Sequence, residues 1–222
     1  MRIPMDFFTY NMPFCAIIIK NSRSDDTMDF ENSKTKINLM RAFAGESMAR
    51  NRYIFSADFS KKEHQHVLEY LFRFTAEQEQ QHAWIFYNHL RELSGKTIVI
   101  DAGYPVNLHQ NTAELLRAAQ HNEYEEFDPV YPQFGRIARE EGFQNIASSF
   151  LKIAEIEKIH GDRFGKFAEF VEKNQLFASD VATKWICLNC GYVYDGFQAP
   201  KACPVCAHDQ GYFIRLELCP FE

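Results

Sequence analysis

The chain has 222 residues, of which 46% are hydrophobic and 24% charged, a composition typical of a globular protein with one or two domains. A net charge of −6 and the lack of a basic stripe argue against a nucleic-acid partner. No run of about 18 apolar residues is present, so no membrane span is expected.

Residues 1–30 are predicted to be a poorly ordered extension. The apolar patches of "MRIPMDFFTYNMPFCAIIIKNSRSDD" are interrupted by Asp6 and Asn11, and no small-residue cleavage pattern follows them. A secreted protein is therefore disfavoured and a cytoplasmic location is expected. Met28, in "MDFENSKTKINLM", is a candidate for the true start of translation.

The first half of residues 31–178 is predicted to contain two long helices. Apolar residues recur at helical spacing in "INLMRAFAGESMARNRYIFSADF" and in "HVLEYLFRFTAEQEQQHAWIFYNHLREL". The next segment, "SGKTIVIDAGYPVNLHQN", contains the strand-like run "TIVI". Because that run has no partner strand, the segment is expected to be an extended crossing.

The second half predicts two further helices. "TAELLRAAQHNEYEEFDPVYPQFGRIAREEG" begins with Thr112 as the expected N-cap, and Pro129 and Pro132 predict a kink within it. Gly142 separates this helix from "FQNIASSFLKIAEIEKIHGDRFGKFAEFVEKN". Four helices joined by two short connections and one long connection predict an all-α four-helix bundle.

A Glu-x-x-His motif occurs once in each half, as Glu79 with His82 and as Glu157 with His160. Residues three apart project from nearly one face of a helix, so each pair offers an oxygen and a nitrogen ligand. One such motif arises readily by chance, but the second has a matching context. Glu46 precedes His82 by 36 positions and Glu123 precedes His160 by 37, so each half contains a glutamate helix followed by a Glu-x-x-His helix.

This arrangement matches the ligand set of di-iron carboxylate bundles. Burying so many carboxylates without countercharge would be prohibitive, and two metal cations would supply that charge. Glu126 lies three positions after Glu123 and adds a carboxylate beyond what such a site requires, whereas Glu125 is on a different face. The predicted ligands in the bundle are Glu46, Glu79, His82, Glu123, Glu126, Glu157 and His160.

Residues 179–222 are predicted to be a small, mostly irregular or β metal domain, and "ASDVATKW", at its beginning, is expected to be a linker. Two Cys-x-x-Cys pairs, separated by twelve residues, contribute Cys187, Cys190, Cys203 and Cys206. Four thiolates in this order predict a tetrahedral metal site, for which the spacing alone allows either a zinc ribbon or a one-iron site. Cys15 and Cys219 are expected to be spectators, and His208 is not expected to be a ligand.

Taken together, "AFAGESMARNRY", the two Glu-x-x-His helices, "YEEFDPVYPQFGRIAREEGF" and the cysteine block resemble the rubrerythrin family over about residues 35–222. The resemblance implies a ferritin-like bundle with a rubredoxin-like C-terminal domain that binds one iron. It also implies that Glu79 and Glu157 bridge two irons, with Glu46 and Glu126 on one iron and Glu123 and His160 on the other.

In this family the first iron exchanges a glutamate ligand for a histidine on reduction, and the matching positions are Glu126 and His82. The resemblance further makes Tyr53 and Tyr131 hydrogen-bond donors to the ligand carboxylates, whereas plain core packing is the alternative role for both. Glu126, His82, Tyr53 and Tyr131 are therefore the residues expected to carry catalysis.

The function implied by the resemblance is a non-haem di-iron peroxidase that reduces hydrogen peroxide to water, in oxidative-stress defence in an anaerobe. Electrons would come from NAD(P)H through a separate reductase or rubredoxin and pass through the four-cysteine iron of a head-to-tail homodimer. No Gly-x-Gly-x-x-Gly turn is present, so the chain itself should not bind NADH. The alternatives are a ferritin-like ferroxidase that handles iron and a bundle with a structural zinc ribbon.

Overall fold

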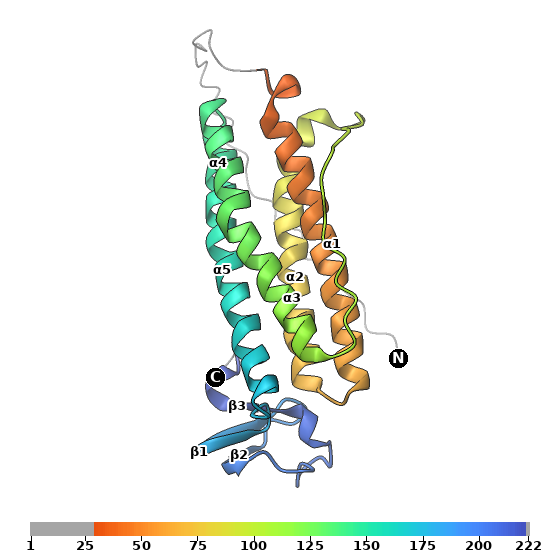
Figure 1. The fold of residues 1–222 in the computed structure, drawn as a ribbon, viewed down its shortest axis with the longest axis vertical. Coiled ribbons are helices and arrows are strands. Elements are labelled where there is room, and N and C mark those ends of the chain that lie inside the picture. The colour runs from red at the N-terminus through yellow and green to blue at the C-terminus, as the bar shows by residue number, and fades with distance from the viewer. Residues whose placement is uncertain (1–28, 221–222) are drawn as a thin grey trace, which may run out of the picture.

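The computed structural model describes residues 29–220, which form an antiparallel helical bundle with a small sheet at one end (Figure 1). The predictions made for residues 1–28, including the start at Met28, lie outside this part of the chain. The expected extension includes Asp29 and Phe30, but the ring of Phe30 packs edge-on against Phe143, with ring centroids 5.2 Å apart. The described fold thus includes the last two residues of the expected extension.

The first two helices are α1 (Lys34–Lys62) and α2 (His66–His89). Ser33 caps α1 by accepting a hydrogen bond from the Lys36 amide. The Glu141 carboxylate also accepts bonds from the amides of Lys34 and Thr35 and from the Thr35 hydroxyl. The start of α1 is therefore fixed to a segment more than 100 positions further along the chain.

The crossing after α2 is extended, and the structure places no strand between residues 94 and 111. It returns along α1 to the opposite end of the bundle (Figure 1), and Tyr104 fastens it by donating a 2.8 Å hydrogen bond to the carbonyl of Arg41. The expected N-cap at Thr112 is wrong by one residue. Asn111 is the cap, because its side chain accepts a bond from the Glu114 amide at 2.8 Å.

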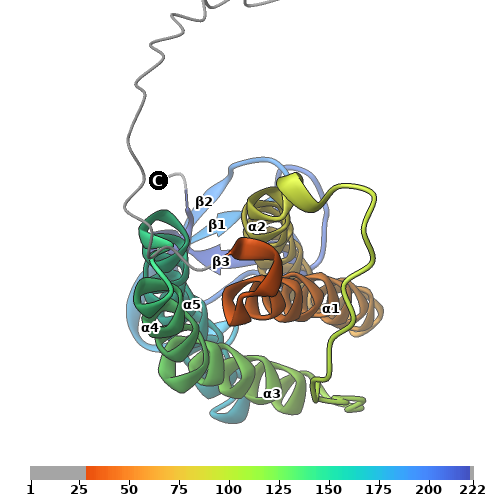
Figure 2. The ribbon, with the colours of Figure 1, turned by 90° about the horizontal axis from the view of Figure 1, so that it is seen from above.

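The third predicted helix is broken into α3 (Thr112–Glu125) and α4 (Tyr131–Glu140). A π-helical turn at Glu126–Val130 joins them, and Asp128 within it has an extended backbone, with φ −156° and ψ 117°. Proline lacks the N–H that would continue the helix, so Pro129 explains the break. The described chain therefore has five α-helices in four bundle positions, since α3 and α4 occupy one position in succession (Figure 2).

The last helix, α5 (Gln144–Glu172), completes the bundle. The core consists of two hydrophobic clusters, one containing Phe72 and Phe164 and the other Phe86 and Phe150. Along each helix of the bundle, with α3 and α4 taken together, the predicted ligands lie between residues of the first cluster and residues of the second. The bundle thus encloses a polar layer within an otherwise apolar interior.

The C-terminal sheet has strands β1 (Ala178–Cys187), β2 (Val193–Gln198) and β3 (Phe213–Arg215), in the antiparallel order β2-β1-β3. The predicted linker at residues 178–185 is therefore wrong, because these residues belong to the central strand. Trp185 lies opposite both Tyr194 and Arg215 and is completely buried.

The sheet packs on the bundle, since Ile186 and Ile214 join the bundle's first hydrophobic cluster.

Within residues 29–220, no helix is long and apolar enough to cross a membrane.

Candidate metal centres

Six of the seven predicted bundle ligands meet between the two hydrophobic clusters, and all six are buried. Each can offer one ligand atom that lies within 4.8 Å of the others in its group. The first group is Glu46, Glu79, His82 and Glu157, and the second is Glu79, Glu123, Glu157 and His160. Glu79 and Glu157 belong to both groups, so each is placed to serve two ions at once.

The two histidines take equivalent positions around these shared glutamates. His82 Nδ1 lies 2.8 Å from Glu157 Oε1 and 3.0 Å from Glu79 Oε2. His160 Nδ1 lies 2.9 Å from the other oxygen of each glutamate. The imidazole rings are nearly parallel, with their centroids 5.7 Å apart. The repeated sequence motif therefore produces a repeated geometry.

Many ligand atoms in this layer are buried without a hydrogen bond of normal geometry among the described residues, although nitrogen and oxygen approach to about 3 Å. Buried polar atoms are normally paired, so such a concentration in one place indicates a cation-binding layer. Carboxylate oxygens and imidazole nitrogens about 3 Å apart suit ions such as iron. The atoms without a partner are Glu46 Oε2, Glu79 Oε1, Glu123 Oε2, both carboxylate oxygens of Glu157 and both ring nitrogens of His160.

The pKa values of the buried ligands in the metal-free site also show that the layer requires positive charge. Burial, followed by repulsion from Glu126, raises the pKa of Glu46 well above its ordinary value. Burial, followed by repulsion from Glu79, does the same to the pKa of Glu123. Burial opposes the charged form of His160, yet the surrounding carboxylates, Glu123 first, raise its pKa to about 12. Protons therefore supply the countercharge that bound cations would replace.

Two buried tyrosines hold the outer carboxylates. Tyr131 donates a 2.5 Å hydrogen bond to Glu46 Oε1, and Tyr53 donates one to Glu123 Oε1. Burial and then the adjacent carboxylates raise the pKa of both phenols, so both remain protonated donors. Each donor leaves the second oxygen of its glutamate for a metal.

Glu126 is the predicted ligand that lies outside both groups. It begins the π-helical turn, is only half-buried, and lines a cavity of about 670 Å³. Arg52, Tyr104 and Tyr131 also line this cavity. The structure thus shows His82 inside the cluster and Glu126 beside it, and the expected exchange between them stays a prediction. Sequence reasoning missed Tyr104, because no residue spacing reveals where a long crossing lies.

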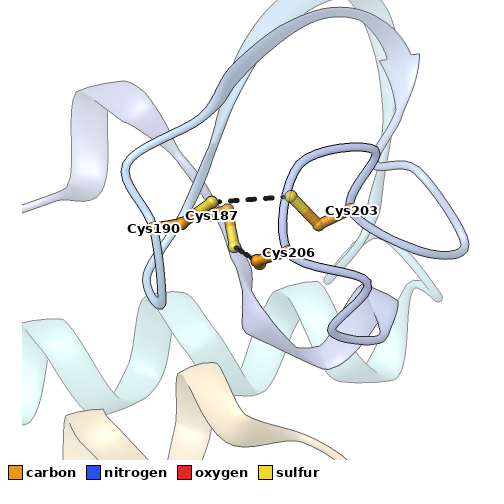
Figure 3. Close-up of side chains that lie close together, drawn as sticks. All are labelled: Cys187, Cys190, Cys203 and Cys206. Carbon is orange, nitrogen blue, oxygen red and sulfur yellow. Dashed lines mark hydrogen bonds between the residues drawn. The ribbon is translucent and has the colours of Figure 1, made fainter.

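The four cysteines converge in the C-terminal domain (Figure 3). Cys187 Sγ lies 3.8 Å from Cys206 Sγ, and Cys190 Sγ lies 3.6 Å from Cys203 Sγ, with no disulfide among them. The four sulfurs fit one tetrahedrally coordinated ion. The backbone amide of His208 is the main cause that lowers the pKa of Cys206, to about 6, which favours the thiolate.

Both cysteine pairs are built on the same type of turn. Gly191 donates its amide to the carbonyl of Cys187 at 2.8 Å, and Ala207 donates to Cys203 at 2.9 Å. Both donors have a left-handed backbone, with φ of 77° and 61°. His208 bonds the carbonyl of Cys206 through Nδ1, and the four-sulfur group does not include it.

Comparison with known proteins agrees with this pair of sites. The family model for rubrerythrin matches residues 38–168, and the model for the rubrerythrin rubredoxin-like domain matches residues 185–214. The chain belongs to the rubrerythrin family. The resemblance deduced from the motifs is thereby confirmed, and with it a di-iron site of glutamate and histidine ligands and a four-cysteine rubredoxin-like iron site.

Curated rubrerythrins are similar over most of the chain. The rubrerythrin of Clostridium perfringens is 40% identical over 184 residues, which cover 82% of this chain and 94% of that protein. The rubrerythrin of Nitratidesulfovibrio vulgaris is 40% identical over 186 residues, covering 84% and 96%.

Solved structures confirm the predicted fold class. The fully reduced, all-ferrous state of nigerythrin has a TM-score of 0.55 at 25% identity and covers 87% of this chain and 94% of its own. A Desulfovibrio desulfuricans bacterioferritin has a TM-score of 0.58 at 22% identity, covering 64% and 82%. The rubrerythrin-family chain is therefore a ferritin-like bundle with a rubredoxin-like tail.

Proposed function

We propose that this rubrerythrin-family chain is a peroxidase that reduces hydrogen peroxide to water in cytoplasmic oxidative-stress defence. Electrons come from NAD(P)H through a separate reductase or rubredoxin and enter at the four-cysteine iron. The observation that carries the proposal is the presence, on one chain, of a buried carboxylate–histidine cluster and a docked four-sulfur site. A store of iron would not require the second site.

The proposed ligand assignment follows the two groups of ligand atoms. Glu79 and Glu157 would serve both irons because both glutamates belong to both groups. Glu123 and His160 would complete the ligands of one iron. Glu46 would complete those of the other, with His82 in the reduced state or Glu126 in the oxidised state, because ferric iron prefers oxygen ligands and ferrous iron also binds imidazole well.

The chemistry that the bound iron pair supplies is the transfer of two electrons, which with two protons converts one hydrogen peroxide into two waters. The chain provides the surroundings for that reaction. The cavity beside Glu126 reaches Tyr131, the donor to Glu46, and so offers a small polar oxidant space next to the cluster. Tyr53 and Tyr131 hold the outer carboxylates in place. The apolar clusters on both sides keep bulk water out of the site.

We propose a head-to-tail homodimer because the two centres of one chain lie far apart. The tail meets α2 at His66, whose ring stacks on Tyr212 with centroids 4.0 Å apart. Glu79 lies thirteen residues further along the same helix, which corresponds to about 20 Å. A second copy could bring its tail closer to the cluster, and the exposed side chains of Phe55 and Trp84 offer apolar surface for such contact.

The experiment that tests this function measures peroxide consumption by the iron-loaded protein with NADH, a rubredoxin and its reductase. Cys206→Ser should abolish this turnover. The same variant, reduced chemically beforehand, should still be oxidised once by peroxide. Normal turnover by Cys206→Ser would remove the four-cysteine site from the electron route. Failure of the unmodified protein to consume peroxide would refute the proposed activity.

A further inference from the structure

Three potential ligands meet at the junction between the bundle and the tail, away from both iron centres. His64 lies in the turn before α2, His66 is the first residue of α2, and Asp209 comes from the tail. One ligand atom from each residue lies within 4.8 Å of the other two. The sequence shows only two histidines among charged residues, because Asp209 follows His64 by 145 positions.

Backbone contacts hold the tail side of this cluster in place. A Cβ atom added to Gly211 would lie 1.9 Å from the carbonyl oxygen of His64, so the close approach of the two segments requires glycine. The Gly211 amide donates a 2.9 Å bond to Asp209 Oδ1. The other carboxylate oxygen, Oδ2, lies 3.3 Å from His64 Nδ1. Asp209 is thus fixed with one oxygen directed at the bundle.

His66 is oriented as a metal-binding histidine usually is. Its ring is buried and stacks on Tyr212, and its Nδ1 lies 3.0 Å from Glu69 Oε2. Arg73 in turn donates a bond to the other oxygen of Glu69. A carboxylate on one imidazole nitrogen fixes the tautomer and leaves Nε2 as the coordinating atom. The hydrogen bond and the ion pair of His66 both use Nδ1.

We propose that His64, His66 and Asp209 bind a divalent transition-metal ion of the zinc class at this junction. Two imidazoles and one carboxylate form a donor set typical of such ions and leave further coordination positions open to water. An ion pair accounts for His64 with Asp209, and Glu69 accounts for the orientation of His66. Neither pair accounts for the convergence of all three ligand residues, which a bound ion would explain. The bound ion would fasten the tail to the beginning of α2.

Zinc titration of the full, iron-loaded chain tests the site. Calorimetry and metal analysis should find one zinc per chain in addition to an unchanged iron content. His64→Asn suits the left-handed backbone at this position, where φ is 54°, and Asp209→Asn keeps a carbonyl for the Gly211 amide. Each variant should weaken zinc binding by about tenfold or more.

His109→Asn is the matched control. His109 lies 3.4 Å from Glu114, so it also belongs to an exposed histidine–carboxylate pair, but it has no third ligand in the described structure. Its replacement should leave zinc affinity unchanged. Zinc should also slow amide hydrogen exchange in residues 208–214 of the unmodified chain but not of His64→Asn.

Three outcomes would overturn the proposed zinc site. The first is the absence of additional zinc at a tenfold excess, and the second is zinc binding only with release of iron. The third is a zinc affinity that does not fall in His64→Asn and Asp209→Asn, or that falls as much in the control His109→Asn as in those two variants.

Discussion

Tyr131 on α4 donates a hydrogen bond to Glu46 on α1, and this relationship recurs between Tyr53 on α1 and Glu123 on α3. The tyrosine of each half therefore holds the glutamate of the other half. Tyr53 follows Glu46 by seven positions, whereas Tyr131 follows Glu123 by eight.

The irregular turn at Glu126–Val130 accounts for this difference, because Asp128 leaves helical geometry there and the second half holds one residue more between its glutamate and its tyrosine. It also accounts for the 36- and 37-residue spacings between glutamate and histidine, since three-residue turns connect the helices in both halves. Glu126 begins the added turn. In the described bundle, this turn is the one place where the second half is longer than the first between its ligands. The extra carboxylate, Glu126, lies in that turn.

Removing one tyrosine hydroxyl should weaken the binding of the iron that the bonded glutamate coordinates. Tyr131→Phe keeps the buried ring but leaves Glu46 without its donor, so iron affinity at that position should fall by about 10- to 100-fold. Tyr53→Phe should have the same effect on the iron served by Glu123. Chelator competition followed by metal analysis measures both losses, and equal iron retention in all three proteins would exclude this role for the tyrosines.

His82→Ala should slow oxidation of the reduced protein by peroxide while the colour of the four-cysteine iron stays intact. The reason is that His82 Nδ1 contacts both shared glutamates, whereas the cysteines lie in another domain. Stopped-flow absorbance gives the rate. His89→Ala is the control on the same helix, because His89 bonds only Ser149 among the described residues. Unchanged turnover in His82→Ala would remove this residue from the proposed exchange.

Glu141→Ala should destabilise the fold by about 0.5–2 kcal/mol, the usual cost of losing a helix cap. Glu141 accepts hydrogen bonds at the first turn of α1, whereas its neighbour Glu140 is exposed and has no such partner within residues 29–220. Urea denaturation should therefore show a loss for Glu141→Ala and little change for Glu140→Ala. Equal midpoints for the two variants would show that the contact does not stabilise the helix.

The contribution of Glu141 to the free energy of unfolding should also depend on pH. Burial raises its pKa, but bonds from Thr35 and Lys34 outweigh burial and hold the pKa below its ordinary value of 4.5. A carboxylate whose pKa is lowered on folding stabilises the protein above the unfolded pKa, and that stabilisation is lost as pH falls below it. The difference between Glu141→Ala and the unmodified chain should therefore shrink below about pH 4.5.

Removal of the iron should make the bundle less stable as pH rises. Glu46 and Glu123 have raised pKa values when buried, and His160 has a pKa of about 12, so the folded chain holds protons that the unfolded chain releases. The stabilisation is present below the unfolded pKa values and is lost as pH rises toward the folded ones. Urea denaturation of metal-free protein at pH 5.5 and pH 8 checks the sign.

The double variant Glu46→Gln with Glu123→Gln is the control for this pH effect. It removes two of the titrating carboxyl groups, so the metal-free variant should lose less stability between the two pH values. A metal-free chain that became more stable at pH 8 would contradict the protonation of the buried layer.

The sequence predicts most of the bundle site because residue spacing within a helix determines which side chains share a face. Glu79 with His82 and Glu157 with His160 meet as their three-residue spacing requires. The position of Glu126 could not be predicted, since it depends on the backbone at Asp128 and Pro129 rather than on helical periodicity.

Contacts between distant segments were also beyond sequence reasoning. The strand at residues 178–187 has no buried residue before Trp185 and is defined by its pairing with β2 and β3. The approach of Asp209 to His64 likewise depends on how the tail packs on α2. Such features follow from tertiary packing, which produces no regular residue spacing in the sequence.

The central claim is that the buried cluster uses its iron pair to reduce peroxide, and single-turnover kinetics test it most directly. Anaerobically reduced, iron-loaded protein is mixed in a stopped-flow instrument with hydrogen peroxide or with dioxygen at equal concentration. The account predicts that peroxide oxidises the iron pair faster, with one peroxide consumed per pair. Faster oxidation by dioxygen, or peroxide oxidation at an equal rate after Glu79→Ala, would contradict it.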